Sequence, residues 1–344
     1  MTRIAVLVGG RSSEHEISCI SARSIVDALD GHDISIVGIT RDGAWVGGTK
    51  DLDSLLVREG SLPHVDDAAP SVDISAALQV DVVFPVLHGP WGEDGTVQGL
   101  LEMYSVPYVG SGVLSSAISM DKGHMKAALR SAGLPVGDWV MIPDRDWRER
   151  SDIALARVAD LGLPVFVKPA RAGSSRGITK VHRAADLRAA IEDARTHDPR
   201  VIVEAAISHM REIECAVLVG PDGTPQASRC AEIVVGAEHE FYDFAAKYVD
   251  DSATLVVPAD LDPALEARVQ ELALAAFEAL DCAGLARVDV FVRGSEVLIN
   301  ELNTMPGFTS ISMFPRMWAA SGLDYRTLVS RLVDDALRRG TGLA

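Results

Sequence analysis

An apolar strand, a helix and a second apolar strand open the chain, and this order constrains the fold more than any other feature. Residues 3–8 form a mostly apolar run that Gly9 and Gly10 end. From about Ile17 to Leu29 apolar residues recur with helical spacing, and a second apolar run covers residues 34–39. Strands joined through a helix pair in parallel, so we expect an open, Rossmann-like α/β sheet here.

A third apolar run, DVVFPVL at residues 81–87, leads directly into the polar loop HGPWGEDG. In open parallel sheets, binding sites lie in the loops at the carboxyl ends of the strands. A βαβ start also raises the alternative of a nicotinamide-dependent oxidoreductase. The GxGxxG fingerprint of that class is missing after the first strand, which argues against this function.

Beyond residue 118 the pattern changes to mixed strands and helices. A helix is predicted from Lys122 to Ser131, with its cap among residues 119–121. Further on we expect strands at 164–170, 178–181 and 201–206 with a helix at about 184–197, a hairpin of 211–220 and 227–235 joined by PDGT, a helix at 263–280, strands at 285–292 and 296–302, and two short final helices. This α/β then α+β layout is too long for one core. We expect three domains, at residues 1–118, 119–208 and 209–344.

Composition excludes several classes of function. The net charge of −17 argues against nucleic-acid or anionic-membrane partners, which favour a basic surface. The four cysteines are scattered without metal-ligand spacing, as expected of buried thiols in a reducing compartment. The first apolar run is too short for a signal peptide, and no stretch reaches transmembrane length. We therefore expect a cytoplasmic protein.

Four polar residues stand on the last two predicted strands. Glu301 and Asn303 are two apart and share one face, as do Arg287 and Asp289 on the preceding strand. A tight turn makes these strands antiparallel neighbours, so the four side chains can converge. Two carboxylates and an amide oxygen suit Mg²⁺ bound to nucleotide phosphates, and arginine can hold an anionic oxygen. The alternative is a surface salt-bridge cluster.

Two further segments carry candidate chemistry. KPARAGSSRG at residues 168–177 contains glycines and serines that can approach phosphate oxygens, although an ordinary hairpin would look the same. Lys122 is a second candidate phosphate ligand, or a surface lysine. Residues 236–254 are mostly polar with several aromatic side chains, and we expect a lid over a site rather than a short surface helix.

Together these segments resemble D-alanine–D-alanine ligases, ATP-grasp enzymes of bacterial cell-wall synthesis. The resemblance rests on seven motifs in order: GGRSSEHEIS, HGPWGEDG, SMDK, VKPARAGSSRG, EFYDFAAKY, ARVDVF and NELNTMPGFTS. It covers nearly the whole chain. It implies an ATP-grasp fold behind the Rossmann-like domain, with ATP and D-alanine as substrates, Mg²⁺ or Mn²⁺ as cofactor, and a homodimer.

The resemblance also implies roles for individual residues. Glu14 would hold the ammonium of the first D-alanine, and His88 would lie near its carboxylate. Ser174 and Tyr248 would link the site to the lid, and Arg287 would stabilise an oxyanion. The remaining assignments are Lys122, Lys168 and Ser175 for ATP phosphates; Glu204, Ile207 and Glu212 for adenine and ribose; Gly307 and Ser312 for the second D-alanine; and Asp289, Glu301 and Asn303 for the metal.

Two positions depart from the family pattern. Ala206 stands where a larger apolar or aromatic residue is common, and Arg176 where a small aliphatic residue is usual. Both concern nucleotide packing rather than the reaction. The alternatives to a dipeptide ligase are a ligase that joins D-alanine to D-lactate, and a catalytically silent nucleotide-binding protein of the same fold. The lid sequence argues against the first, and the intact polar residues argue against the second.

Overall fold

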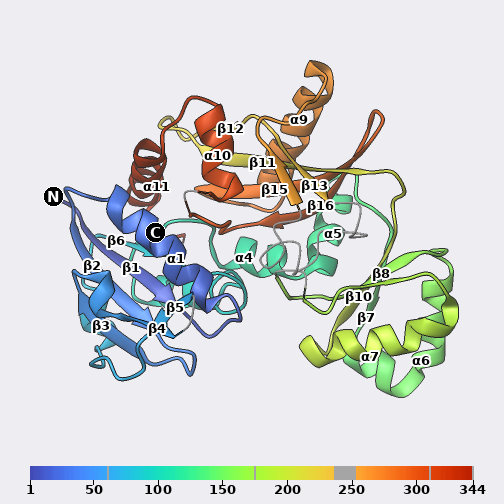
Figure 1. Ribbon diagram of the computed structural model, residues 1–344, viewed down its shortest axis with the longest axis horizontal. Helices are drawn as coiled ribbons and strands as arrows, with labels where there is room; N and C mark the ends of the chain where they lie inside the picture. Colours follow the sequence, from blue (N-terminus) through green and yellow to red (C-terminus); the bar gives the residue numbers. More distant parts are fainter. Residues whose placement is uncertain (60–61, 174–175, 236–252, 310, 343–344) are drawn as a thin grey trace.

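The computed structural model describes residues 1–59, 62–173, 176–235, 253–309 and 311–342. Three main sheets are arranged along the molecule, the first at one end and the second at the other (Figure 1). The third sheet lies in the middle of the molecule, between the other two, and above α4 and α5 in the view of Figure 1. A separate hairpin of β4 (Leu56–Glu59) and β5 (Leu62–Val65) covers part of the first sheet.

The first sheet is the expected Rossmann-like unit. Its order is β3-β2-β1-β6, with β1 parallel to both β2 and β6 and only β3 antiparallel. Helices α1 and α11 pack on one face of β1 through its even-numbered residues, and α2 and α3 pack on the other. The bounds are β1 (Arg3–Gly9), β2 (Asp33–Ile39), β3 (Trp45–Thr49), β6 (Val82–Pro85), α1 (His15–Ala28), η1 (Leu52–Ser54), α2 (Ile74–Ala77), α3 (Thr96–Met103) and α11 (Tyr325–Arg339).

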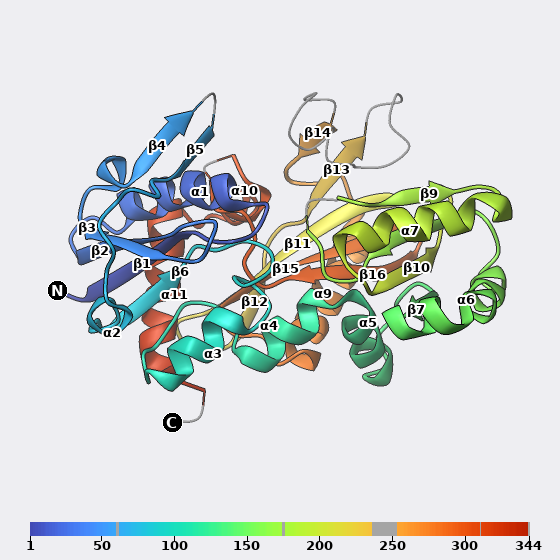
Figure 2. The ribbon, with the colours of Figure 1, turned by 90° about the horizontal axis from the view of Figure 1, so that it is seen from below.

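The second sheet is wholly antiparallel, in the order β7-β10-β8-β9. Helices α6 and α7 cover its outer side, at the end of the molecule away from the first sheet (Figures 1 and 2). The bounds are β7 (Trp139–Ile142), β8 (Val165–Pro169), β9 (Thr179–Val181), β10 (Val201–Ala205), α6 (Asp144–Ala159), η2 (Ala184–Asp186) and α7 (Leu187–His197). Helices α4 (Val113–Met120) and α5 (Lys122–Ser131) connect it to the first sheet.

The third sheet has the order β14-β13-β11-β15-β16, with β12 paired to β11. Alternate residues of β11 and β15, such as Cys215 and Val288, pack against α9, and several of the residues between them, such as Glu214 and Asp289, face a cavity. This alternation follows from the two-residue period of a strand. The bounds are β11 (Arg211–Val219), β12 (Pro225–Ala227), β13 (Ala231–Val235), β14 (Ala253–Val256), β15 (Leu285–Arg293), β16 (Glu296–Asn303), α9 (Pro263–Ala279) and α10 (Met313–Ala320).

Two local predictions were wrong. The return strand predicted at 227–235 is two strands, β12 and β13, because Ser228 Oγ accepts the N–H of Ala216 and interrupts the ladder. The cap of α5, expected among residues 119–121, is Asp121, which accepts the N–H groups of Gly123 and His124; residues 119 and 120 end α4. The last helix, α11, is 15 residues long rather than short. Helix α6 was not anticipated.

Within the described residues, no helix is both long and apolar enough to cross a membrane. All four cysteines are free thiols, as expected, and Cys19, Cys215 and Cys230 are buried. Burial raises the pKa of the Cys19 thiol to about 12, so it is protonated and unreactive at neutral pH.

His15 ties the loop after β1 to the β4–β5 hairpin. Its Nδ1 donates to the carbonyl of Gly10 at 2.6 Å, and its Nε2 accepts the N–H of Val65 at 3.0 Å. A ring that donates from one nitrogen and accepts at the other is neutral. Burial lowers the pKa of His15 accordingly.

This buried histidine predicts a loss of stability in acid. The unfolded ring takes up a proton near pH 6.5 and the folded ring does so only at lower pH, so the free energy of unfolding falls as pH drops below about 6.5. One such group contributes a slope of at most about 1.4 kcal/mol per pH unit. His15→Gln retains a donor and an acceptor and should flatten the profile between pH 7 and 5, measured by urea unfolding. The exposed control His197→Gln should keep the wild-type slope; equal slopes in all three proteins would contradict the assignment.

Candidate active site

Strands β15 and β16 bring four polar side chains to one face of the third sheet. Their register places Arg287 opposite Asn303 and Asp289 opposite Glu301. Arg287 donates from Nε and Nη2 to the two oxygens of Asp289, both at 2.7 Å, and Asn303 Nδ2 donates to Asp289 Oδ2 at 3.1 Å. The four residues converge as the sequence predicts, on the wall of a cavity of about 840 Å³.

A third carboxylate, Glu214, joins this group from β11. It lies opposite Asp289 in the sheet, and its Oε1 is 3.3 Å from Arg287 Nε. Burial alone would lower the pKa of Arg287, but the charges of Asp289 and Glu214 raise it well above its ordinary value. Glu214 was not predicted from the sequence. The signal was available, because Glu212 and Glu214 are two apart on a strand and share a face.

The donor set fits a hard divalent cation. Asp289, Glu301 and Asn303 offer two carboxylates and an amide oxygen, the ligands that Mg²⁺ takes together with phosphate oxygens and water. Among the residues that the structure describes, no group of three histidine, cysteine, aspartate or glutamate side chains is arranged to hold a metal. A metal on this face therefore depends on the amide of Asn303 and on oxygens from a ligand.

Lys122 approaches the same face from α5. As the first residue of the helix it follows the Asp121 cap, and its Nζ donates to the carbonyl of Ala172 at 3.0 Å. The same Nζ is 3.4 Å from Glu301 Oε2. Lys122 is thus not a surface lysine: it joins the loop after β8 to the carboxylates of β16.

Lys168 lies on β8 and shares one carboxylate with a second lysine. Its Nζ is 2.5 Å from Glu204 Oε2, and Lys126 Nζ is 3.0 Å from Glu204 Oε1. Burial alone would raise the pKa of Glu204, but the two lysines lower it to about 2. Lys126 was missed from the sequence, although it follows Lys122 by four residues and so lies on the same face of α5.

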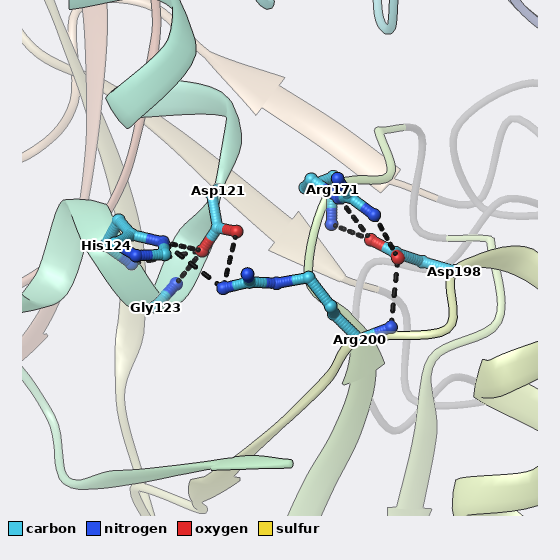
Figure 3. Close-up of polar contacts among 6 residues, drawn as sticks. All are labelled: Asp121, Gly123, His124, Arg171, Asp198 and Arg200. Atoms are coloured by element: carbon cyan, nitrogen blue, oxygen red, sulfur yellow. Dashed lines mark hydrogen bonds and ion pairs between the residues drawn. The ribbon is translucent and has the colours of Figure 1, made fainter. Parts of the chain in front are cut away.

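A network of charged residues holds the loop after β8 in place (Figure 3). Asp198 accepts from the backbone N–H and Nε of Arg171, both at 3.0 Å, from Arg171 Nη2 at 2.8 Å, and from the N–H of Arg200. Arg200 in turn contacts Asp121 Oδ2 at 3.0 Å. The start of α5 and the loop carrying Ala172 are therefore fixed to the same segment. No sequence motif pointed to Asp198.

His88 lies at the carboxyl end of the first sheet, and both of its ring nitrogens are engaged. Nδ1 is 3.1 Å from the carbonyl of Met305, to which it donates, and Nε2 is 3.1 Å from the hydroxyl of Ser21. Burial lowers the pKa of His88, so the ring is neutral. Its contacts join the loop after β6 to the turn after β16.

Glu93 makes the same connection and was also missed. Its carboxylate accepts the N–H of Gly89 at 2.6 Å and that of Met305 at 3.2 Å. Burial and the nearby charge of Glu14 raise the pKa of Glu93 to about 8. Glu14 lies against two polar loops, the one after β6 that carries Gly89 and the one after β8 that carries Gly173. A Cβ on Gly89, whose φ is +72°, would be 2.8 Å from one Glu14 oxygen, and a Cβ on Gly173 would be 3.1 Å from the other.

The other predicted residues line the same cavity. Gly307 and Ser312 are adjacent, and a Cβ on Gly307 would lie 3.0 Å from Ser312 Oγ. Glu212 and Ile207 line the end near the second sheet, where the apolar neighbours are Phe166, Ile178, Ala205 and Met210. The two residues that depart from the family pattern are Ala206, whose N–H donates to the carbonyl of Pro164, and Arg176, which is exposed. Neither residue is part of the cavity wall.

Some predicted residues cannot be placed. Ser174, Ser175 and Tyr248 lie outside the described residues, as does most of the expected lid. Its last two residues, Ala253 and Thr254, belong to β14. The lid therefore stays a prediction.

Comparison with known proteins gives a consistent answer over the whole chain. Residues 3–111 match the family model described as "D-ala D-ala ligase N-terminus", and residues 128–334 match "D-ala D-ala ligase C-terminus". A D-alanine–D-alanine ligase of Mycobacterium sp. (strain JLS) is 52% identical over 370 aligned residues, covering 99% of this chain and 98% of the relative.

Two solved structures are similar in fold as well. The D-alanine–D-alanine ligase from Coxiella burnetii has a TM-score of 0.80 and 36% identity, with 98% of this chain and 94% of that chain covered. The VanG D-Ala:D-Ser ligase from Enterococcus faecalis has a TM-score of 0.81 and 37% identity, with 97% and 99% covered. The expected combination of a Rossmann-like domain with an ATP-grasp fold is confirmed.

Proposed function

This chain belongs to the D-alanine–D-alanine ligase family, and from that premise we propose that its cavity joins two D-alanine molecules to D-alanyl-D-alanine, a peptidoglycan precursor, while ATP is converted to ADP and phosphate. One observation carries the assignment of the site. Lys122 Nζ lies 3.4 Å from Glu301 Oε2, so a phosphate-binding cation meets a metal-binding carboxylate on the cavity wall. Such an arrangement suits a triphosphate that reaches both.

The first step activates a carboxylate. A carboxylate oxygen of the first D-alanine attacks the γ-phosphorus of ATP, the bond to the bridging oxygen breaks, and ADP leaves an acyl phosphate. Glu14 holds the ammonium of this substrate between the two polar loops, and Lys122 and Lys168 attract the phosphates. Mg²⁺ or Mn²⁺ held by Asp289, Glu301 and Asn303 would neutralise charge on the phosphoryl oxygens.

The second step forms the peptide bond. The amine nitrogen of the second D-alanine attacks the acyl carbon, the bond to the phosphate oxygen breaks, and the amine loses its proton. Arg287 stabilises the oxyanion of the tetrahedral intermediate, and Gly307 and Ser312 receive the carboxylate of the incoming substrate. His88 acts by holding the turn at Met305, since its ring nitrogens are taken by Met305 and Ser21.

Nucleotide binding uses the end of the cavity between the second and third sheets. The apolar side chains of Phe166 and Ile207 suit an adenine ring, and Glu212 suits the ribose hydroxyls. The resemblance places Glu204 beside adenine and ribose. Because Glu204 is also paired with Lys126 and Lys168, we propose that it acts on the phosphate side of the nucleotide site as well.

Measuring phosphate release identifies which molecule serves as the second substrate. We expect release from ATP and Mg²⁺ with D-alanine alone, none with L-alanine, and no increase when D-lactate is added to limiting D-alanine. Adding D-serine tests the activity named for the Enterococcus faecalis structure. Mass spectrometry of the product distinguishes dipeptide, depsipeptide and mixed dipeptide. A chain that releases no phosphate under any of these conditions would be the catalytically silent alternative.

We further infer a cytoplasmic homodimer. The free thiols suit a reducing compartment. Large apolar side chains are exposed where α3 ends and α4 begins, with Met103 87% and Leu114 68% exposed, and such exposure is typical of contact surfaces between subunits. Sedimentation equilibrium should give twice the mass of 36.7 kDa. A monomer at micromolar concentration would refute the dimer.

Loss of Asp198 should weaken ATP binding although Asp198 is outside the cavity wall. Asp198→Ala removes the hydrogen bonds that hold Arg171 and Arg200, and bonds to charged groups contribute about 1.5–3 kcal/mol each. We expect the KM for ATP to rise about tenfold, because the loop carrying Ala172 is released. The matched control is Asp186→Ala, which removes an exposed two-pronged pair with Arg183 and should leave KM unchanged. Steady-state kinetics that show equal KM values in both variants would contradict this role.

A further inference from the structure

Lys126, which has no role in the proposed reaction, forms a buried triad of charges with Glu204 and Lys168. It lies one turn after Lys122 on α5, and its side chain is only 3% exposed. Its Nζ contacts one oxygen of Glu204 and Lys168 contacts the other. Lys168 and Glu204 line the cavity, whereas Lys126 is not part of its wall. Lys126 therefore touches a bound ligand only through Glu204.

The charges of the triad do not cancel. Within the triad, two ammonium groups and one carboxylate leave a net charge of +1, with the side chains 11% exposed or less. The carboxylates of Glu301 and Glu212, on the cavity wall, also act on Lys168, so the charge of Lys126 offsets part of this negative surrounding. Burying an unbalanced charge is costly unless a partner compensates for it. A Lys168–Glu204 pair alone would be neutral and would attract an anion weakly. The excess charge that Lys126 supplies makes this wall of the cavity attractive to an anion.

We propose that Lys126 is a positioning residue for the nucleotide phosphates: it occupies one oxygen of Glu204, so that the charge of Lys168 remains available to the ligand. This inference rests on the proposed function, because the anion it serves is the polyphosphate of ATP. The ligand class is a nucleoside di- or triphosphate, and a nucleoside without phosphate gains nothing from the triad. The purely structural alternative is that Lys126 only neutralises a buried carboxylate.

The test compares a nucleotide with its nucleoside. Lys126→Met keeps an unbranched buried side chain and removes the charge. Titration calorimetry of the full chain should show that the affinity for ADP with Mg²⁺ falls about tenfold or more, as expected from the loss of a nearby charge in a partly shielded site, while the affinity for adenosine is unchanged. Kinetically, the KM for ATP should rise more than kcat falls.

A second variant restores the charge balance. Lys126→Met combined with Glu204→Gln removes one positive and one negative charge and returns the net charge to +1. The ratio of ADP affinity to adenosine affinity should recover to within about threefold of the wild-type ratio, as expected if net charge governs the attraction; the ratio cancels any contact that Glu204 itself makes to the nucleoside. This double variant leaves no buried carboxylate between the lysines, so it carries the test if Lys126→Met alone does not fold. The control Arg130→Met removes an exposed charge of the same helix, paired with Asp138, and should bind ADP normally.

Each outcome distinguishes the positioning role of Lys126 from a purely structural role. Equal losses for adenosine and ADP in Lys126→Met, or no loss for ADP, would overturn the positioning role and favour the structural one. A double variant that folds and whose ratio of ADP affinity to adenosine affinity is still ten times below the wild-type ratio would overturn it as well. If wild type binds no ADP and releases no phosphate, the proposed function itself fails and the inference falls with it; normal wild-type activity with either of the preceding results refutes the inference alone.

Discussion

Glu301→Gln is expected to lower kcat by about a hundredfold or more, because a bound metal contributes several kcal/mol of charge stabilisation in the transition state. A change of about 1.4 kcal/mol in the activation free energy alters the rate tenfold. Glu301 faces Asp289 across the β15–β16 ladder and lies 3.4 Å from Lys122. An amide at this position keeps the size of the side chain and loses the charge that we propose holds Mg²⁺. The measurement is the dependence of turnover on Mg²⁺ at saturating ATP and D-alanine, where we expect the variant to need more metal.

The control lies on the same strand. Glu296→Gln removes an exposed carboxylate paired with Arg293 at the hairpin turn and should leave the Mg²⁺ dependence unchanged. Thermal unfolding of both variants separates a loss of function from a loss of fold. A Glu301→Gln protein with wild-type turnover at limiting Mg²⁺ would remove Glu301 from the metal site.

The parts of the fold that depend on local pattern could be predicted from the sequence. The first βαβ unit could be predicted because continuous apolar strands flank a helical pattern. The β15–β16 hairpin could be predicted because Gly294 lies in its turn. The break between β12 and β13 has no local signal. It arises because Ser228 bonds to Ala216, a residue 12 positions away on another strand.

The residues of the site also divide into those that the sequence predicts and those that it misses. Arg287, Asp289, Glu301 and Asn303 could be predicted to lie on neighbouring antiparallel strands because a tight turn joins these strands. Their exact pairing also depends on a register shift between Asp289 and Val290, which the sequence does not show. Residues whose role depends on long-range pairing were missed. Asp198 acts on Arg171, 27 residues away, and Glu93 acts on Met305, 212 residues away. Neither separation is encoded in a motif, so only the packed structure reveals these partners.

Replacing Arg287 by lysine should lower kcat by about 10²–10³, the usual cost of losing one donor to a developing oxyanion. In the structure the guanidinium of Arg287 is shared between Asp289 and Glu214. Asp289 is also a proposed metal ligand, so a guanidinium with several donors can keep one carboxylate and still reach an oxyanion. Lysine has a single ammonium group and lacks this planar fork. We expect the KM for ATP to change little, because Lys122 and Lys168 remain.

Lysine is the informative substitution here because it keeps the charge. Arg287→Met would leave Asp289 and Glu214 buried without their cation, and removing one partner of a buried ion pair costs about 3–5 kcal/mol, so lost activity in that variant could reflect unfolding. The matched control is Arg211→Lys, which alters a two-pronged pair with Glu232 on the same sheet. Single-turnover kinetics should show that this control forms dipeptide at the wild-type rate, whereas Arg287→Lys accumulates ADP more slowly or hydrolyses the acyl phosphate without forming dipeptide. A normal rate of dipeptide formation in Arg287→Lys would show that the charge alone suffices and that the fork has no part in stabilising the oxyanion.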